Sequence, residues 1–150
     1  MIVLSTGLRQ AMTGNVGAAA AFANGVLYIF DGPQPVNADA AATGNLLIKV
    51  TLASGAFTFG TSTNGLTLVS TAGVLSKDSG VWSGNGILAG TAGWWRLMGN
   101  PVDNLLSSTT LARMDGNIGV GGSDLNVGTV AVAVGAPFTI DTFQYTLPSN

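Results

Sequence analysis

The sequence contains no cysteine, no histidine and no glutamate, so all seven of its acidic residues are aspartates. Without cysteine, neither a disulfide framework nor a zinc–thiolate site is available. Without histidine or glutamate, Ser–His–Asp and Cys–His nucleophile systems, histidine metal ligands and glutamate acids or bases are excluded as well. Any catalysis would depend on Asp, Lys, Tyr or Ser.

Charge is also scarce. Charged residues make up 8% of the 150 residues, against about a quarter in an ordinary soluble domain. Five basic and seven acidic residues give a net charge of −2, so the release of counterions that drives nucleic-acid binding would be weak. We therefore expect no nucleic-acid partner, and a surface that suits packing against another protein.

Long apolar runs are missing. The longest, within "GAAAAFANG" (17–25), falls well short of the roughly 18 residues typical of a membrane span. The N-terminal stretch "MIVLSTGLRQAMTG" lacks the basic start and the apolar length of a signal peptide. We expect neither membrane insertion nor export.

The main helical zone of the sequence lies within residues 5–24. Ser5 or Thr6 can cap a short turn that runs through Met12, and the alanine run that follows is closed by Asn24 and Gly25. The segment is mildly apolar and poor in charge. We expect residues 1–25 to form an N-terminal arm, helical or extended, that orders against a neighbouring subunit.

From residue 26 onward, short apolar or β-branched runs recur between Gly, Asn, Ser and Pro, which is typical of strands. The runs cover residues 26–30, 46–52, 56–60, 66–69, 81–98, 109–114, 129–134 and 138–147. Residues 31–45 contain two prolines and read as a long connection, with one turn of helix at 38–42. The pattern predicts one all-β domain over 26–150, a β-sandwich or jelly roll.

The glycine-rich stretch "ARMDGNIGVGGSDLNVG" (112–128) could be a ligand loop. A calcium loop would need a closing glutamate, and a phosphate loop would need a lysine and a following helix. The chain offers none of these here, so we predict two turns, one at "DGN" (115–117) and one at "GVGGSD" (119–124). In the second turn, Asp124 would bond its own backbone. Lys77 and Asp78 likewise fit a solvated loop pair better than a catalytic dyad.

Trp94 and Trp95 stand side by side, and adjacent residues of a strand point to opposite faces. Leu97 shares the side of Trp95, which predicts that Trp95 enters the core. Arg96 shares the side of Trp94, which predicts an exposed, partner-facing side, since Trp and Arg are enriched at protein interfaces. An exposed Trp beside a cation could also serve as a carbohydrate platform.

Five stretches together resemble a known family: "LSTGLRQAM", "ANGVLYIFDGPQPVNADAAATGNLL", "GVLSKDSGVWSGNGILAGTAGWWRL", "RMDGNIGVGGSDLNV" and "TIDTFQYTLP". The chain is similar to small virion proteins of tailed bacteriophages, and among them to the jelly-roll cement or decoration proteins of the head. The resemblance implies a dimer or other homo-oligomer on the capsid surface of the virion, assembled in the host cytoplasm, that binds between major capsid protein subunits. It implies no catalytic residue, cofactor or metal.

We therefore expect a cement protein that acts through contacts alone. The alternatives are a tail or head–tail adaptor component, a carbohydrate-binding adsorption module and, more remotely, an aspartate-based hydrolase. The residues expected at the interface are Trp94, Arg96, Leu8, Arg9 and Met12.

Overall fold

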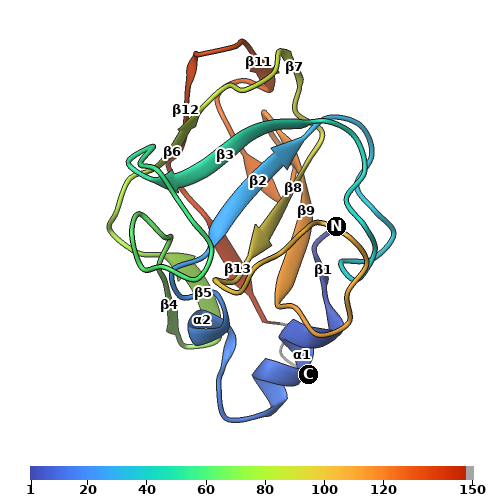
Figure 1. The fold of residues 1–150 in the computed structure, drawn as a ribbon, viewed down its shortest axis with the longest axis vertical. Helices are drawn as coiled ribbons and strands as arrows, with labels where there is room; N and C mark the ends of the chain where they lie inside the picture. The colour runs from blue at the N-terminus through green and yellow to red at the C-terminus, as the bar shows by residue number, and fades with distance from the viewer. Residues whose placement is uncertain (148–150) are drawn as a thin grey trace.

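The computed structural model describes residues 1–147, which form an all-β sandwich with a short N-terminal helix, as the sequence predicts (Figure 1). Two helices follow the first strand: α1 (Thr6–Thr13) and α2 (Ala18–Ala21). The strands are β1 (Val3–Leu4), β2 (Val26–Phe30), β3 (Leu46–Leu52), β4 (Leu68–Thr71), β5 (Val74–Lys77), β6 (Trp82–Asn85), β7 (Gly90–Thr91), β8 (Trp94–Met98), β9 (Arg113–Gly119), β10 (Leu125–Asn126), β11 (Ala131–Val132), β12 (Pro137–Ile140) and β13 (Gln144–Thr146).

The main sheet has eight strands. Seven follow the order β1-β9-β8-β2-β3-β6-β12, all antiparallel, and β10 pairs in parallel with β9. In the centre of the sheet, Leu27 and Ile29 of β2 lie opposite Leu97 and Trp95 of β8. Side chains alternate between the two faces of a strand, and these four are fully buried on one face. This inner face carries the main core.

A second, three-stranded sheet of β13, β5 and β4 packs over the inner face. Phe143, just before β13, joins the two layers, because its ring centroid lies 5.4 Å from that of Trp82 and 5.3 Å from that of Trp95. Strands β7 and β11 form a separate two-stranded ribbon. This ribbon lies at the opposite end of the molecule from the helices (Figure 1).

The N-terminal segment contains the short helix that the sequence predicts, and it packs on the sandwich of its own chain. Strand β1 pairs with β9 at the edge of the main sheet. Leu8 and Phe22 are fully buried in the main core. The predicted cap is confirmed: the Ser5 hydroxyl accepts a hydrogen bond from the Leu8 amide at 3.0 Å. The same hydroxyl donates to the Leu111 carbonyl, which fixes α1 against the loop before β9.

The predicted strands at 26–30 and 46–52 are confirmed as β2 and β3, whereas several others differ. Residues 56–60 are not a strand; Phe57 and Phe59 pack inward from a loop. The run 129–134 forms only the two-residue β11, and 138–147 divides into β12 and β13, which lie in different sheets. At 38–42 the chain makes a turn without a helix, closed by hydrogen bonds from the Ala40 amide to Asn37.

The predicted turn at residues 115–117 is also wrong, because the chain continues there as strand β9 to Gly119. Gly116 lies opposite Trp95 in the register. A Cβ atom at this position would lie 2.5 Å from the Trp95 ring. Glycine at this position therefore leaves room for the Trp95 indole within the strand. In the sequence, the same glycine looks like a turn residue.

Candidate functional site

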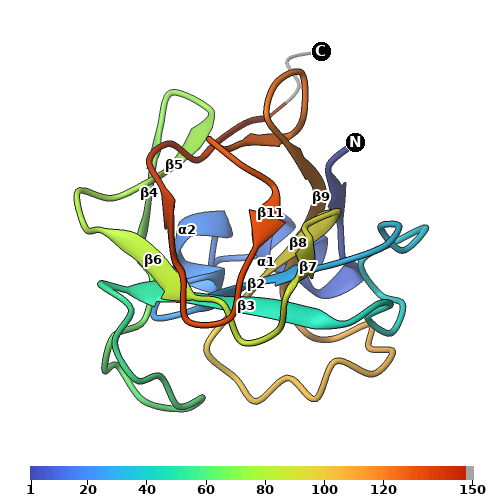
Figure 2. The same ribbon diagram turned by 90° about the horizontal axis from the view of Figure 1, so that it is seen from above.

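The outer face of the main sheet is covered by three loops of the same chain. These are loop 31–45, loop 53–67 and loop 99–112, the segments between β2 and β3, β3 and β4, and β8 and β9. They enclose a second apolar cluster, which we call the outer cluster: Val26, Tyr28, Phe30, Trp94 and Met98, with Ala42, Leu46, Phe57, Phe59 and Leu105 packed around it. Figure 2 shows loops 53–67 and 99–112 on one side of β2 and β3, away from β4 and β5.

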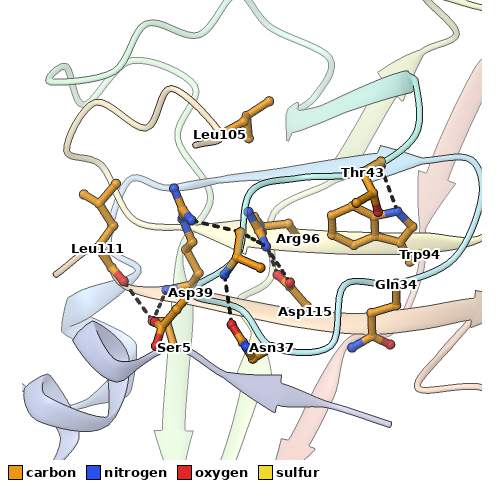
Figure 3. Close-up of polar contacts among 12 residues, drawn as sticks. Ser5, Gln34, Asn37, Asp39, Thr43, Trp94, Arg96, Leu105, Leu111 and Asp115 are labelled. Atoms are coloured by element: carbon orange, nitrogen blue, oxygen red, sulfur yellow. Dashed lines mark hydrogen bonds and ion pairs between the residues drawn. The ribbon is translucent and has the colours of Figure 1, made fainter. Parts of the chain in front are cut away.

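Trp94 is 0% exposed, so the prediction that it faces a partner is wrong. Its ring stacks on Phe30, with the centroids 4.4 Å apart and 12° between the planes. Its indole N–H donates to the Thr43 carbonyl at 3.2 Å, and Figure 3 shows Thr43 beside the ring. The physical reason is loop 31–45, which closes over this face. Trp95 is a core residue, as predicted, and its N–H donates to the Asn117 carbonyl.

Arg96 is likewise fully buried and faces no partner surface. Its Nε and Nη2 atoms each donate to the carboxylate of Asp115 at 2.7 Å (Figure 3). The two residues lie directly opposite each other on β8 and β9. The Arg96 Nη2 atom also donates to the Ala40 carbonyl at 3.1 Å. Arg96, which the sequence predicted at an interface, is therefore buried within the chain. The Asp115 carboxylate compensates for the hydration that its guanidinium group loses.

A second buried ion pair lies beside the first. Arg113 donates through Nε and Nη2 to both carboxylate oxygens of Asp103, each at 2.6 Å. Its Nη2 also donates to the Leu106 carbonyl, and its Nη1 to the Ala40 carbonyl that Arg96 contacts. The Ala40 carbonyl therefore joins both guanidinium groups, and the two pairs fasten loops 31–45 and 99–112 to the sheet.

This network also sets the electrostatics of the outer face. Burial raises the pKa of the Asp115 carboxyl, and the hydrogen bonds and charge of Arg96 oppose that effect. Burial and the nearby Asp103 carboxylate raise the pKa of the Tyr28 phenol. At the neck of loop 31–45, hydrogen bonds from Asn45 lower the pKa of the Asp31 carboxyl. These contacts hold loops in place and bring no nucleophile beside a base.

The remaining predicted interface residues lie on α1. Leu8 is buried in the core, so it is not available as an anchor for a partner, whereas Met12 is only partly buried against the core. Arg9 is exposed, and its Nη2 atom donates to the Thr6 hydroxyl at 3.0 Å. Of the five predicted interface residues, Arg9 is therefore exposed and Met12 partly exposed, while Leu8, Trp94 and Arg96 are buried.

The turn at residues 119–124 forms as predicted, but the Asp124 carboxylate does not accept its hydrogen bond from the backbone of that turn. Its Oδ2 atom accepts the Asn117 amide at 3.0 Å and lies 2.7 Å from the amino group of Met1. Asn117 in turn accepts from the Asp124 amide at 2.7 Å. Within residues 1–147, no group of three or more Asp, Glu, His or Cys side chains is placed to hold a metal ion.

A shallow, open groove lies where loops 31–45 and 99–112 meet. Its volume is about 560 Å³, and its lining is Asn37, Asp39, Ala40, Ser107, Ser108, Thr109 and Thr110. The Asp39 carboxylate is occupied, because it accepts from the amide and the hydroxyl of Thr6 at 2.8 and 2.6 Å. The groove is lined mainly by hydroxyl groups and contains no aromatic ring, so it lacks the stacking platform that was considered for sugars.

The outer surface carries few charges. Four of the twelve charged side chains, the members of the two Arg–Asp pairs, are buried, so eight remain for the whole surface. Large aliphatic side chains are exposed instead: Val16, Val36, Leu52, Val69, Val81, Ile87, Leu88, Val102, Leu106, Val120 and Val134, together with Met1. Sequence reasoning found the low total charge. It did not find that a third of the charged residues are internal.

Neither helix in residues 1–147 is long and apolar enough to cross a membrane. Comparisons with protein-family models, with curated proteins and with solved structures give no match to this chain.

Proposed function

We propose that the protein is a structural component of a tailed-bacteriophage virion, a cement protein that binds between major capsid protein subunits and stabilises the head. It acts through contacts and carries out no chemistry. The resemblance of the sequence to such proteins suggests this function, and the surface of the domain supports it.

The observation that carries the proposal is the distribution of charge. With Arg96, Arg113, Asp103 and Asp115 paired internally, the surface has eight charged side chains, while eleven large aliphatic side chains besides Met1 are exposed over the described residues. A domain that is not part of an assembly usually has a surface with many charged side chains of both signs. A nearly neutral surface with scattered aliphatic groups suits a domain that is covered by an assembly.

The alternative of a carbohydrate-binding module loses its main support, because both tryptophan rings considered for it are fully buried. A tail or head–tail adaptor component has the same surface requirements as a cement protein, so the two differ in location and not in chemistry.

The proposal is tested with particles that lack the protein. Heads without it should release their DNA at a lower temperature than complete heads, because each bound copy stabilises the assembled state by mass action. Adding the purified protein back should restore the release temperature. Heads that are equally heat-resistant with and without the protein would contradict the cement function.

A further inference from the structure

The main sheet ends at β12, and the outer edge of this strand pairs with no other strand of residues 1–147. The Gly86 amide donates to the Ala136 carbonyl at 3.0 Å. The same register places Phe138 opposite Gly84. Hydrogen-bonded pairs alternate along an antiparallel ladder, so Phe138 bonds to β6. The N–H and C=O groups of the next residue, Thr139, therefore point to the free edge.

A groove lies beside this edge. Its volume is about 230 Å³, and it is lined by residues 127–129 from one segment and by residues 137–139 and Asp141 from the other. Val127 and Phe138 contribute apolar surface to the lining. Thr139 is exposed, so its backbone groups are open to a second chain. Asp141 is also exposed and is the one charged residue of the lining.

The residues that flank Thr139 restrict what can pair with the edge. Pro137 has no N–H group to donate, and a charge such as that of Asp141 opposes indiscriminate pairing at a sheet edge. Thr139 therefore offers the central donor and acceptor, and it can exchange two backbone hydrogen bonds with one residue of an added strand. An edge of this kind suits a short extended segment.

We propose that the free edge of β12 binds an extended segment of a partner protein that carries an apolar and a basic side chain. The segment would exchange backbone hydrogen bonds with Thr139, a form of β-strand addition. Side chains alternate along a strand, so the residues next to the paired one would lie on the face of Phe138, where an apolar side chain fits. Residues two positions away would lie on the other face, near Asp141, where a basic side chain gains a counter-charge.

The test uses the peptide acetyl-Thr-Lys-Val-Thr-Val-Lys-Thr-amide, whose palindromic sequence suits either strand direction. At millimolar concentration it should shift the backbone amide resonances of Thr139 and Asp141 in nuclear magnetic resonance spectra of the isolated full-length chain. The same peptide with glutamate in place of both lysines should bind at least tenfold more weakly, because it brings like charges beside Asp141.

Two variants should also weaken binding of the lysine peptide at least tenfold. Thr139→Pro removes the outward N–H group and no bond to β6, and proline is tolerated at such an edge. Asp141→Lys reverses the charge of the groove. The matched controls are Thr139→Val, which keeps the backbone N–H group, and Asp78→Lys, which makes the same charge change in an exposed loop outside the groove. Both controls should bind the peptide as the wild type does.

The absence of any shift at Thr139 with millimolar lysine peptide would overturn the proposal. Equal affinity for the lysine and glutamate peptides, or wild-type affinity in both Thr139→Pro and Asp141→Lys, would overturn it as well. Should Thr139→Pro misfold, Asp141→Lys and the pair of peptides still decide. The measurement needs no particle, so its outcome is independent of the test of the cement function.

Discussion

Two buried Arg–Asp pairs join the outer loops to the main sheet, and they leave eight of the twelve charged side chains for the surface. Arg96 and Arg113 project from neighbouring strands, and Ala40 of loop 31–45 accepts hydrogen bonds from both. Each guanidinium is compensated by a bidentate carboxylate. Such pairs contribute little net stability compared with apolar packing, but losing one partner leaves a buried charge.

Asp115→Ala should therefore destabilise the fold by about 3–5 kcal/mol, because Arg96 would remain charged and buried without its carboxylate. The free energy of unfolding in urea checks this. Asp78→Ala is the matched control, because Asp78 is exposed in a loop, and it should change stability by no more than about 0.5 kcal/mol. Equal stability of the two variants would show that the Arg96–Asp115 pair is not buried as described.

The adjacent tryptophans give a second prediction. Trp94 packs in the outer cluster and Trp95 in the main core, and both are fully buried. Each alanine replacement should cost about 3–5 kcal/mol, because each leaves a large cavity. If one ring were exposed, as strand alternation alone suggests, Trp94→Ala would unfold at the wild-type urea concentration, which would contradict the buried position.

The N-terminal elements β1 and α1 complete the domain. Strand β1 forms an edge of the main sheet, and α1 lies against loop 99–112 so closely that a Cβ atom at Gly7 would lie 2.4 Å from the Thr110 carbonyl oxygen. Leu8 reaches the core from this helix. These contacts make the first thirteen residues part of the fold.

Leu8→Ala should lower the free energy of unfolding by about 2–5 kcal/mol, since it removes a fully buried side chain. Arg9→Ala, one residue further along the same helix, is exposed and should cost no more than about 0.5 kcal/mol. Deletion of residues 1–12 should abolish the cooperative urea transition. If the deletion variant unfolds as cooperatively as the full chain, residues 1–12 are an arm that the fold does not need, and this prediction is contradicted.

The elements that could be predicted from sequence are those whose pattern reflects local physics. The apolar runs of β2 and β3 are bounded by turn residues, and the Ser5 cap depends on its own helix. The misassigned elements depend on distant partners. In the sequence, Gly116 looks like a turn residue, but in the fold it lies within a strand, opposite Trp95. The stretch "FTIDTFQYTL" looks like one strand, but it divides at Phe143, whose ring packs between the two sheets.

The candidate site was less predictable for the same reason. Strand alternation correctly placed Trp94 and Arg96 on the face opposite Trp95. The prediction then assumed that side chains on the face away from the core would contact a partner. Loops 31–45, 53–67 and 99–112 cover it, and a loop's path over a sheet leaves no periodic signal. The buried carboxylate of Asp115 lies nineteen residues from Arg96 in the chain. The sequence did contain one signal of buried ion pairs, because Arg96 and Arg113 both lie within predicted strands of a chain with few charged residues.

The whole molecule is a sandwich with both faces of its main sheet covered by its own chain and with few charged side chains on its surface. The exposed aliphatic side chains favour a surface that is covered by a partner. This surface agrees with the proposal that the protein is part of a larger assembly, with the major capsid protein as its partner.

The proposed location, on the outer surface of a phage capsid, is tested most directly by difference density. Difference density between wild-type particles and particles lacking the protein should appear on the outer surface of the capsid, between major capsid protein subunits. The size of each feature should match one or two copies of a 15.0 kDa domain. Difference density confined to the tail or to the head–tail junction, or no difference anywhere on the particle, would contradict the account.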